Sequence, residues 1–118
     1  MARILLVDDD PSVRTVVSLM LERAGHTVDV ASDGEESLAR AAAHPPELVL
    51  SDLCMPGMTG DEVLRGIKQT APDAICVLMT GDADQSTAFP DLDAQFLKKP
   101  FSMAGLIEAV ESALGATK

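Results

Sequence analysis

Short runs of apolar residues alternate with amphipathic stretches along the whole chain, and this alternation restricts the possible folds more than any other feature. The runs lie at residues 4–7, 27–31, 48–50, 75–79 and 95–98. Between most of them, apolar side chains recur every three or four residues, which is the spacing of one helix face. Strands that alternate with amphipathic helices are typical of α/β domains with a parallel sheet. We therefore expect five βα units in a single domain, residues 1–118.

Local signals predict several helix boundaries. Asp10 followed by Pro11 predicts the start of the first helix, because Asp accepts hydrogen bonds from free N–H groups and Pro fits the first helical position. Residues 32–35 and 59–62 match capping boxes and predict two further starts. The apolar residues of the first helix predict one continuous buried face, made of Val13, Val16, Val17, Met20, Leu21 and Ala24.

The connection between the fourth and fifth strands is the weakest part of the pattern. Residues 82–93 contain four aspartates and Pro90 but show little helical periodicity. We expect at most a short or degenerate fourth helix there, near residues 83–88.

Composition argues against several functional classes. The net charge of −10 argues against a nucleic-acid partner, because binding a duplex relies on Lys and Arg. No apolar run approaches the roughly 20 residues that a membrane-spanning helix needs, so we expect no membrane insertion and a cytoplasmic location. Cys54 and Cys76 form neither a disulfide framework nor a metal-finger spacing, and Cys76 is expected in the core. His26 and His44 fall in loops and are expected to be solvated.

Polar residues follow the strands at their carboxyl ends, where open parallel sheets bind ligands. These residues are Asp8, Asp9, Asp52, Thr80 and Lys99. Three neighbouring carboxylates repel one another unless a cation compensates, and oxygen ligands that leave room for water suit Mg²⁺. Lys99 and Thr80 would complete a pocket for a tetrahedral anion. Asp52 is the best candidate nucleophile, because it stands alone at the end of a central strand.

Each of these residues also has an ordinary structural explanation. The acidic residues 8–10 could merely cap the first helix. Lys99 could be an edge lysine, and Thr80 could be a turn residue. Their joint placement at one edge of the sheet is what favours a functional site.

Four short segments follow one another along the chain: Val7-Asp8-Asp9-Asp10, Ser51-Asp52 followed by Met55-Pro56-Gly57, Met79-Thr80-Gly81, and Lys99-Pro100-Phe101. In order and with compatible spacing, they resemble the signature segments of two-component response regulator receiver domains. The resemblance covers the whole chain. It implies a flavodoxin-like, doubly wound fold, with a five-stranded parallel sheet of order 2-1-3-4-5 between two layers of helices.

The resemblance also implies how the acidic residues work. Asp52 would accept a phosphoryl group from a histidine kinase, a phosphotransfer domain or a small phosphodonor. Asp9 and Asp52 would bind Mg²⁺ directly, together with the backbone carbonyl of Cys54. Asp8 would act mostly through water.

The remaining site residues would convert phosphorylation of Asp52 into a conformational change. By the same resemblance, Lys99 would pair with phosphoryl oxygens, and Thr80 and Phe96 would form the conformational switch. Phe96 stands where the family often has Tyr, and the stretch between Thr80 and Lys99 is shorter than usual. In this it resembles receivers of hybrid histidine kinases, so the rest of such a chain is a further expected partner. A receiver catalyses only its own phosphorylation and dephosphorylation, so it is not expected to be an enzyme.

Two other functions are compatible with parts of the sequence. A haloacid-dehalogenase-type phosphatase would use Asp8 as its nucleophile, but Pro11 stands where its opening motif has Thr or Val. The chain is also short for such an enzyme, and Asp52 would have no role. A pseudo-receiver that binds partners without phosphorylation has little support, because all the required residues are present.

Overall fold

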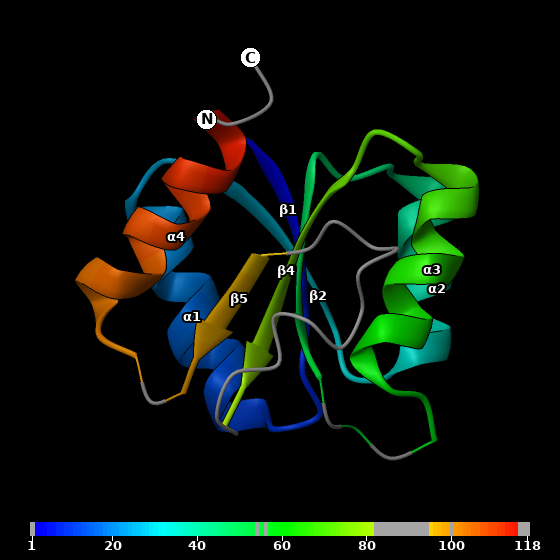
Figure 1. Cartoon of the computed structure of the whole chain (residues 1–118), viewed down its shortest axis with the longest axis horizontal. Helices are drawn as coiled ribbons and strands as arrows, with labels where there is room; N and C mark the ends of the chain where they lie inside the picture. Colours follow the sequence, from blue (N-terminus) through cyan, green and yellow to red (C-terminus); the bar gives the residue numbers. More distant parts are fainter. Residues whose placement is uncertain (1, 54, 56, 82–94, 100, 116–118) are drawn as a thin grey trace.

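Five strands form one parallel sheet (Figure 1). They are β1 (Arg3–Val7), β2 (Thr27–Ala31), β3 (Leu48–Asp52), β4 (Ile75–Thr80) and β5 (Gln95–Lys98). Their order in the sheet is β2-β1-β3-β4-β5, as predicted, and all four pairings are parallel. The computed structural model describes residues 2–53, 55, 57–81, 95–99 and 101–115. The direction of the strand order reverses between β1 and β3, so the expected ligand-binding edge lies at their carboxyl ends.

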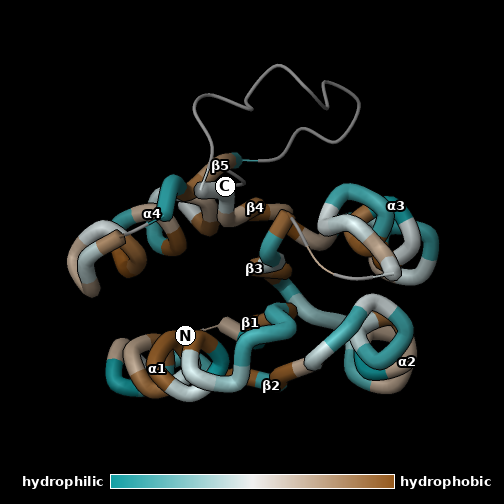
Figure 2. The backbone as a smooth tube through the Cα atoms, turned by 90° about the horizontal axis from the view of Figure 1, so that it is seen from below, coloured by the Kyte–Doolittle hydropathy of each residue, from teal (hydrophilic) through white to brown (hydrophobic). Residues whose placement is uncertain are grey.

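Helices cover both faces of the sheet, as expected for a doubly wound fold (Figure 2). They are α1 (Pro11–Arg23), α2 (Gly34–Ala43), α3 (Gly60–Thr70) and α4 (Met103–Gly115). The pair α1 and α4 lies on one face, and the pair α2 and α3 lies on the other. The short helix predicted near residues 83–88 falls outside the described residues.

The sheet is buried on both faces, which explains why its central strands are almost continuously apolar. Successive side chains of a strand point to opposite faces. One set packs against α1 and α4 and comprises Ile4, Leu6, Leu48, Leu50, Val77 and Met79. The other set packs against α2 and α3 and includes Leu5, Val7, Val49 and Leu78. Burial of each such side chain stabilises the fold by about 1.5–3 kcal/mol, so the strands that carry the site are held firmly in place.

The predicted buried face of α1 is only partly correct. Val17 and Leu21 are buried, whereas Val16 is 49% exposed and Ala24 is exposed. The reason is the position of α1 beside α4 at one side of the sheet, which leaves part of its apolar surface uncovered. That surface forms an apolar groove together with Lys99 and Phe101, lined on the α1 side by Ser12, Val13, Val16, Val17 and Met20.

The helix starts agree with two of the three predicted caps. The Asp10 side chain accepts a hydrogen bond from the Ser12 N–H at 2.9 Å, and Glu62 forms the capping box at the start of α3. The start of α2 lies one residue later than predicted. Its cap is Asp33, which accepts from the Glu36 N–H at 2.8 Å. Overlapping acidic signals in this segment explain why the sequence pattern misplaced the cap.

The prediction that both histidines are solvated is wrong for His26. The His26 side chain is buried, with Nδ1 accepting a hydrogen bond from the Ala2 N–H at 3.1 Å. Its Nε2 lies 3.0 Å from Glu111 Oε2, on α4. His26 therefore joins the start of β1 to the last helix, whereas His44 is exposed as expected.

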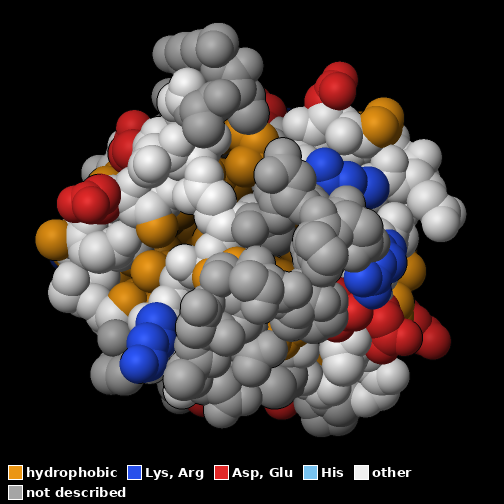
Figure 3. Space-filling view, in the orientation of Figure 1, with side chains coloured by type: hydrophobic (Ala, Val, Ile, Leu, Met, Phe, Trp, Pro, Cys, Tyr) orange, Lys and Arg blue, Asp and Glu red, His pale blue; other side chains and the backbone are white. Residues whose placement is uncertain are grey.

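The surface carries a large excess of acid, in keeping with the net charge of −10. On the face drawn in Figure 3, the described Lys and Arg side chains lie in separate places among acidic and neutral ones. None of the helices in the described part of the chain has the length and apolar character needed to cross a membrane.

Candidate functional site

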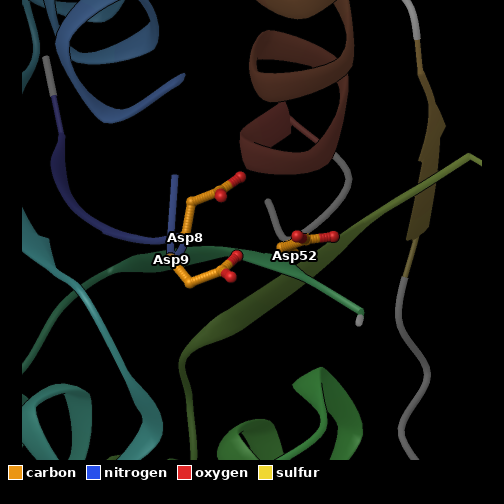
Figure 4. Close-up of side chains that lie close together, drawn as sticks. All are labelled: Asp8, Asp9 and Asp52. Carbon is orange, nitrogen blue, oxygen red and sulfur yellow. The ribbon is translucent and has the colours of Figure 1, made fainter. Parts of the chain in front are cut away.

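Three carboxylates meet at the carboxyl ends of β1 and β3 (Figure 4). Asp8 and Asp9 follow β1 directly, and Asp52 is the last residue of β3. The pairing of Val7 with Ser51 brings the two strand ends level, so the acidic residues after them become neighbours. One oxygen from each carboxylate lies within 4.8 Å of the others. The predicted convergence of these three residues is thus seen in the structure.

Asp8 is the most firmly held of the three. It is 1% exposed, and its backbone N–H donates to the Ala31 carbonyl at 3.2 Å. Its Oδ1 accepts from the Asp10 N–H at 2.9 Å, and its Oδ2 lies 3.4 Å from Lys99 Nζ. With both oxygens engaged, Asp8 is a poor candidate for a nucleophile. The structure therefore does not favour the dehalogenase-type phosphatase.

Asp9 and Asp52 are more open. Asp9 is exposed, and the Asp52 side chain is 13% exposed. The backbone of Asp52 is also fixed, because the buried Ser51 hydroxyl donates a hydrogen bond of 3.0 Å to the Asp52 carbonyl. The pair of oxygens most accessible to a ligand therefore belongs to Asp9 and Asp52.

Lys99 supplies a positive charge at the same edge. Its backbone N–H donates to the Thr80 carbonyl at 2.7 Å, which fixes the end of β5 beside the end of β4. Its Nζ lies 3.5 Å from Asp52 Oδ1, in addition to its contact with Asp8. One ammonium cannot neutralise three carboxylates, so the cluster retains an excess negative charge that a divalent cation would relieve.

The donor set fits Mg²⁺, which prefers oxygen ligands and keeps part of its water shell. Two ligand oxygens on opposite sides of one Mg²⁺ are about 4.2 Å apart, as follows from its bond lengths of about 2.1 Å. One oxygen from each carboxylate lies within 4.8 Å of the others, so one ion can be close to all three. The exposure of Asp9 leaves space for the water molecules that this ion retains.

Thr80 lies on β4, the strand next to β3, and Phe96 lies on β5, one strand further along the sheet. Thr80 is buried at the end of β4, one residue beyond Met79, which pairs with Asp52. Phe96 is half-buried on β5 and pairs with Leu78, packing against the core on the α2–α3 side. The residue predicted to bind through its backbone carbonyl, Cys54, lies outside the described residues.

Gly60 supports the site and was not singled out from the sequence. Its N–H donates to the Leu53 carbonyl at 2.8 Å, so the first turn of α3 packs directly against the end of β3. A Cβ at this position would overlap the backbone oxygen of Asp52 and lie 2.9 Å from Leu53 Cα. The only signal in the sequence was a glycine at the first helical position, which is too common to identify a close approach.

Comparison with known proteins identifies the family. The family model described as the response regulator receiver domain matches residues 4–111. The chain is 35% identical over 119 residues to the response regulator MprA of Mycobacterium ulcerans, covering 98% of this chain and 51% of that protein. It is 37% identical over 112 residues to the DNA-binding transcriptional regulator NtrC of Salmonella typhimurium, covering 92% of this chain and 24% of that protein.

Solved structures agree with these relatives. The chemotaxis protein CheY4 of Vibrio cholerae superposes with a TM-score of 0.89 at 30% identity, over 96% of this chain and 98% of that one. NtrX of Brucella abortus gives a TM-score of 0.89 at 32% identity, over 98% of this chain and 27% of that one. The chain spans about half the length of MprA and about a quarter of the length of NtrC. With this fold and the matching family model, the chain belongs to the response regulator receiver domain family.

Proposed function

We propose that Asp52 accepts a phosphoryl group in a Mg²⁺-dependent reaction and that this modification is the signal the domain transmits. The observation that carries the proposal is the placement of Lys99 Nζ 3.5 Å from Asp52 Oδ1, beside two further carboxylates. An ammonium and a cation-binding acidic cluster around one carboxylate suit the transfer of a phosphoryl group, which needs positioning and charge neutralisation more than covalent chemistry.

Asp9 and Asp52 would hold Mg²⁺ directly, because their oxygens are the accessible ones. Asp8 would act through water, since Asp10 and Lys99 already engage its two oxygens. The backbone carbonyl of Cys54 is proposed as a further ligand by resemblance to the family. When bound, Mg²⁺ supplies positive charge against the carboxylates and the phosphoryl oxygens.

In the reaction, an Asp52 oxygen forms a bond to phosphorus as the bond from phosphorus to the donor's imidazole nitrogen breaks. The electron pair of that bond stays on the imidazole, and Asp52 becomes an acyl phosphate. Lys99 stabilises the phosphoryl oxygens, since its ammonium already faces Asp52.

The burial of Thr80 next to Asp52 supports a role for its hydroxyl as a hydrogen-bond donor to the phosphoryl group. Phe96, half-buried on the neighbouring strand, would turn inward with it. These two residues would form the two-state element that converts a local charge change into a different surface.

The proposed donors are a histidine kinase or a phosphotransfer domain, with the remainder of a hybrid kinase chain as a further partner. Residues 1–118 form one receiver domain in this account, placed in the cytoplasm and catalysing only its own phosphorylation and dephosphorylation. The net charge of −10 gives no support to nucleic-acid binding by this domain itself. No membrane insertion is proposed.

Incubation with acetyl phosphate, followed by intact-mass measurement, tests the proposal. We expect a gain of one phosphoryl group with Mg²⁺, no gain with chelator, and no gain in Asp52→Asn. Asp73→Asn is the matched control, because Asp73 is an exposed aspartate just before β4, at the opposite edge of the sheet. Labelling that persists in Asp52→Asn, or that needs no Mg²⁺, would contradict the proposal.

A further inference from the structure

Arg14, at the end of the first turn of α1, reaches back to the turn that carries the acidic cluster. Its Nη1 donates a hydrogen bond of 2.7 Å to the backbone carbonyl of Asp8, six residues earlier. Arg14 is half-buried. Among the described residues it forms no ion pair, although the carboxylates of Asp8 and Asp10 belong to the same turn. Its guanidinium is therefore directed at a backbone oxygen.

The Asp8 carbonyl has a special place in the site, because it belongs to the peptide group that joins Asp8 to Asp9. A peptide group is planar, so a bond that fixes its oxygen also fixes the direction in which the chain enters Asp9. Asp9 has little other support. Within the described part of the chain, no hydrogen bond or ion pair to its side chain is present, and it is exposed.

The other contacts of this turn hold Asp8 itself. They are the bond from the Asp8 N–H to Ala31, the bond from the Asp10 N–H to Asp8 Oδ1, and the contact of Lys99 with Asp8 Oδ2. None of them acts on the peptide group leading to Asp9. Arg14 is the described residue whose side chain holds that group.

We propose that Arg14 is a positioning residue for the cation site: by holding the Asp8–Asp9 peptide group, it directs the Asp9 carboxylate toward Asp52. The inference rests on the proposed function only for the identity of the cation, Mg²⁺. It predicts that Arg14 strengthens cation binding even though its own positive charge opposes that binding. Partners that orient metal ligands commonly change metal affinity by a factor of about 10–100 when they are removed.

Three substitutions separate the hydrogen bond from the charge. Arg14→Met removes both, Arg14→Gln removes the charge and keeps an N–H donor, and Arg14→Lys keeps both in a shorter side chain. Arg23→Met is the matched control, because it removes the same charge from the last turn of the same helix, away from the site. The chain has no Trp or Tyr, so Mg²⁺ binding is best followed by isothermal titration calorimetry on the full chain.

We expect Arg14→Met to weaken Mg²⁺ binding about tenfold. Arg14→Lys should restore part of the affinity, and Arg23→Met should leave it within about twofold of the parent. The urea midpoint of Arg14→Met should stay close to that of Arg23→Met, which separates positioning from a general loss of stability. In acetyl phosphate reactions, the Mg²⁺ concentration for half-maximal rate should rise, with the rate at saturating Mg²⁺ nearly unchanged.

Unchanged or tighter Mg²⁺ binding in Arg14→Met would overturn the inference, since it would show that charge repulsion outweighs positioning. Weakening by the same factor in Arg23→Met would also overturn it. Arg14→Gln, which keeps a donor without the charge, should bind Mg²⁺ more tightly than Arg14→Met. If Arg14→Met does not fold, Arg14→Ala decides, because it also removes both the donor and the charge and favours the helix: binding weaker than in the parent supports positioning, and binding equal or tighter contradicts it. Because calorimetry needs no phosphorylation, a failure of the proposed function at Asp52 would leave this test intact.

Discussion

The ammonium of Lys99 lies 3.4 Å from a carboxylate oxygen of Asp8, although 91 positions separate the two residues in the chain. Lys99 follows β5, the outermost strand on one side of the sheet. Asp8 follows β1, and the strands β4 and β3 lie between β5 and β1. The long side chain of Lys99 spans the ends of the strands between them and also reaches Asp52. The ion pair thus connects the end of the last strand to the acidic cluster. It places the Lys99 ammonium where a phosphoryl group on Asp52 would lie.

Replacing Lys99 with Met should slow phosphorylation of Asp52 by acetyl phosphate about 100-fold, because a charged donor at the transferred group is lost. The variant should also be less stable without Mg²⁺ by about 1–3 kcal/mol, since the buried Asp8 carboxylate loses its partner. Mass spectrometry over time and urea unfolding measure the two effects. Lys98→Met is the matched control, as Lys98 is the exposed last residue of β5, directly before Lys99. Equal effects in both variants would contradict the role of Lys99.

Mg²⁺ should stabilise the folded domain, because it binds a carboxylate cluster that exists only when the strands are paired. At about 100 times its dissociation constant, a ligand of this kind raises the free energy of unfolding by about 2.7 kcal/mol. Asp9→Asn should lose most of that increase, whereas Asp73→Asn should keep it. Urea titrations with Mg²⁺ or with chelator give the comparison. An Asp9→Asn protein that is stabilised as much as the parent would show that the ion binds elsewhere.

Gly60→Ala should displace the end of β3 and destabilise the domain by about 1–3 kcal/mol, because the added methyl group meets backbone atoms that cannot rotate away. Gly66→Ala is the informative comparison. There the added Cβ meets Leu38 Cδ2, the far end of a flexible side chain, and Ala favours the helix more than Gly does. Urea midpoints measure both. A smaller loss in Gly60→Ala than in Gly66→Ala would contradict the close packing of α3 on β3.

His26→Leu should cost about 1–3 kcal/mol, because the buried Ala2 N–H loses its acceptor. The ring of His26 must carry its proton on Nε2 when Nδ1 accepts from that N–H, and this tautomer also donates to Glu111. His44→Leu, at an exposed position, should change stability by less than about 0.5 kcal/mol. Thermal or urea unfolding distinguishes the two. Equal stability in both variants would mean that the His26 bonds contribute nothing.

The stability of the fold should depend on pH through Glu36, at the start of α2. The backbone N–H of Ser32, 2.7 Å from Glu36 Oε1, is the main cause that lowers the pKa of Glu36 below 4.5, and the Ser32 hydroxyl adds to it. A lowered pKa in the folded state stabilises the fold above about pH 4.5, and this stabilisation is lost as the pH falls through the folded pKa. The effect should be small, because the side chain is 38% exposed.

Ser32→Ala should raise the pKa of Glu36 part of the way back, because the hydroxyl bond is lost and the backbone bond remains. An NMR titration of the Glu36 carboxylate measures the shift directly. A pKa that does not move would contradict the contribution of the hydroxyl.

Most of the fold and the main site residues could be predicted from the sequence, because both follow from periodicity. Apolar runs set the strands, and parallel strands bring their carboxyl ends to one edge, so Asp8, Asp52 and Lys99 had to converge. That inference needs no long-range information beyond the direction of the strands. The order of the strands came from the family resemblance, and the structure confirms it.

The features that were missed or wrong depend on which surfaces meet in three dimensions. Val16 has the spacing of a buried residue, but it lies on the part of α1 that is exposed to solvent. His26 looks like a loop residue, yet its ring meets Glu111 on a helix 85 positions away. The long reach of Arg14 back to the Asp8 carbonyl leaves no trace in a hydrophobic pattern. Gly60 is similar, because only the packed structure shows how near Asp52 lies.

Identification of the phosphorylated residue decides whether Asp52 is the phosphoacceptor. The protein is phosphorylated with acetyl phosphate and Mg²⁺ and then treated with borohydride, which reduces an aspartyl phosphate to homoserine. Peptide sequencing by mass spectrometry then reads positions 8, 9 and 52 in the same sample. We predict homoserine at position 52 alone, with Asp8 and Asp9 unchanged. Homoserine at position 8 or 9, or a phosphorylated protein with no homoserine at position 52, would contradict the account.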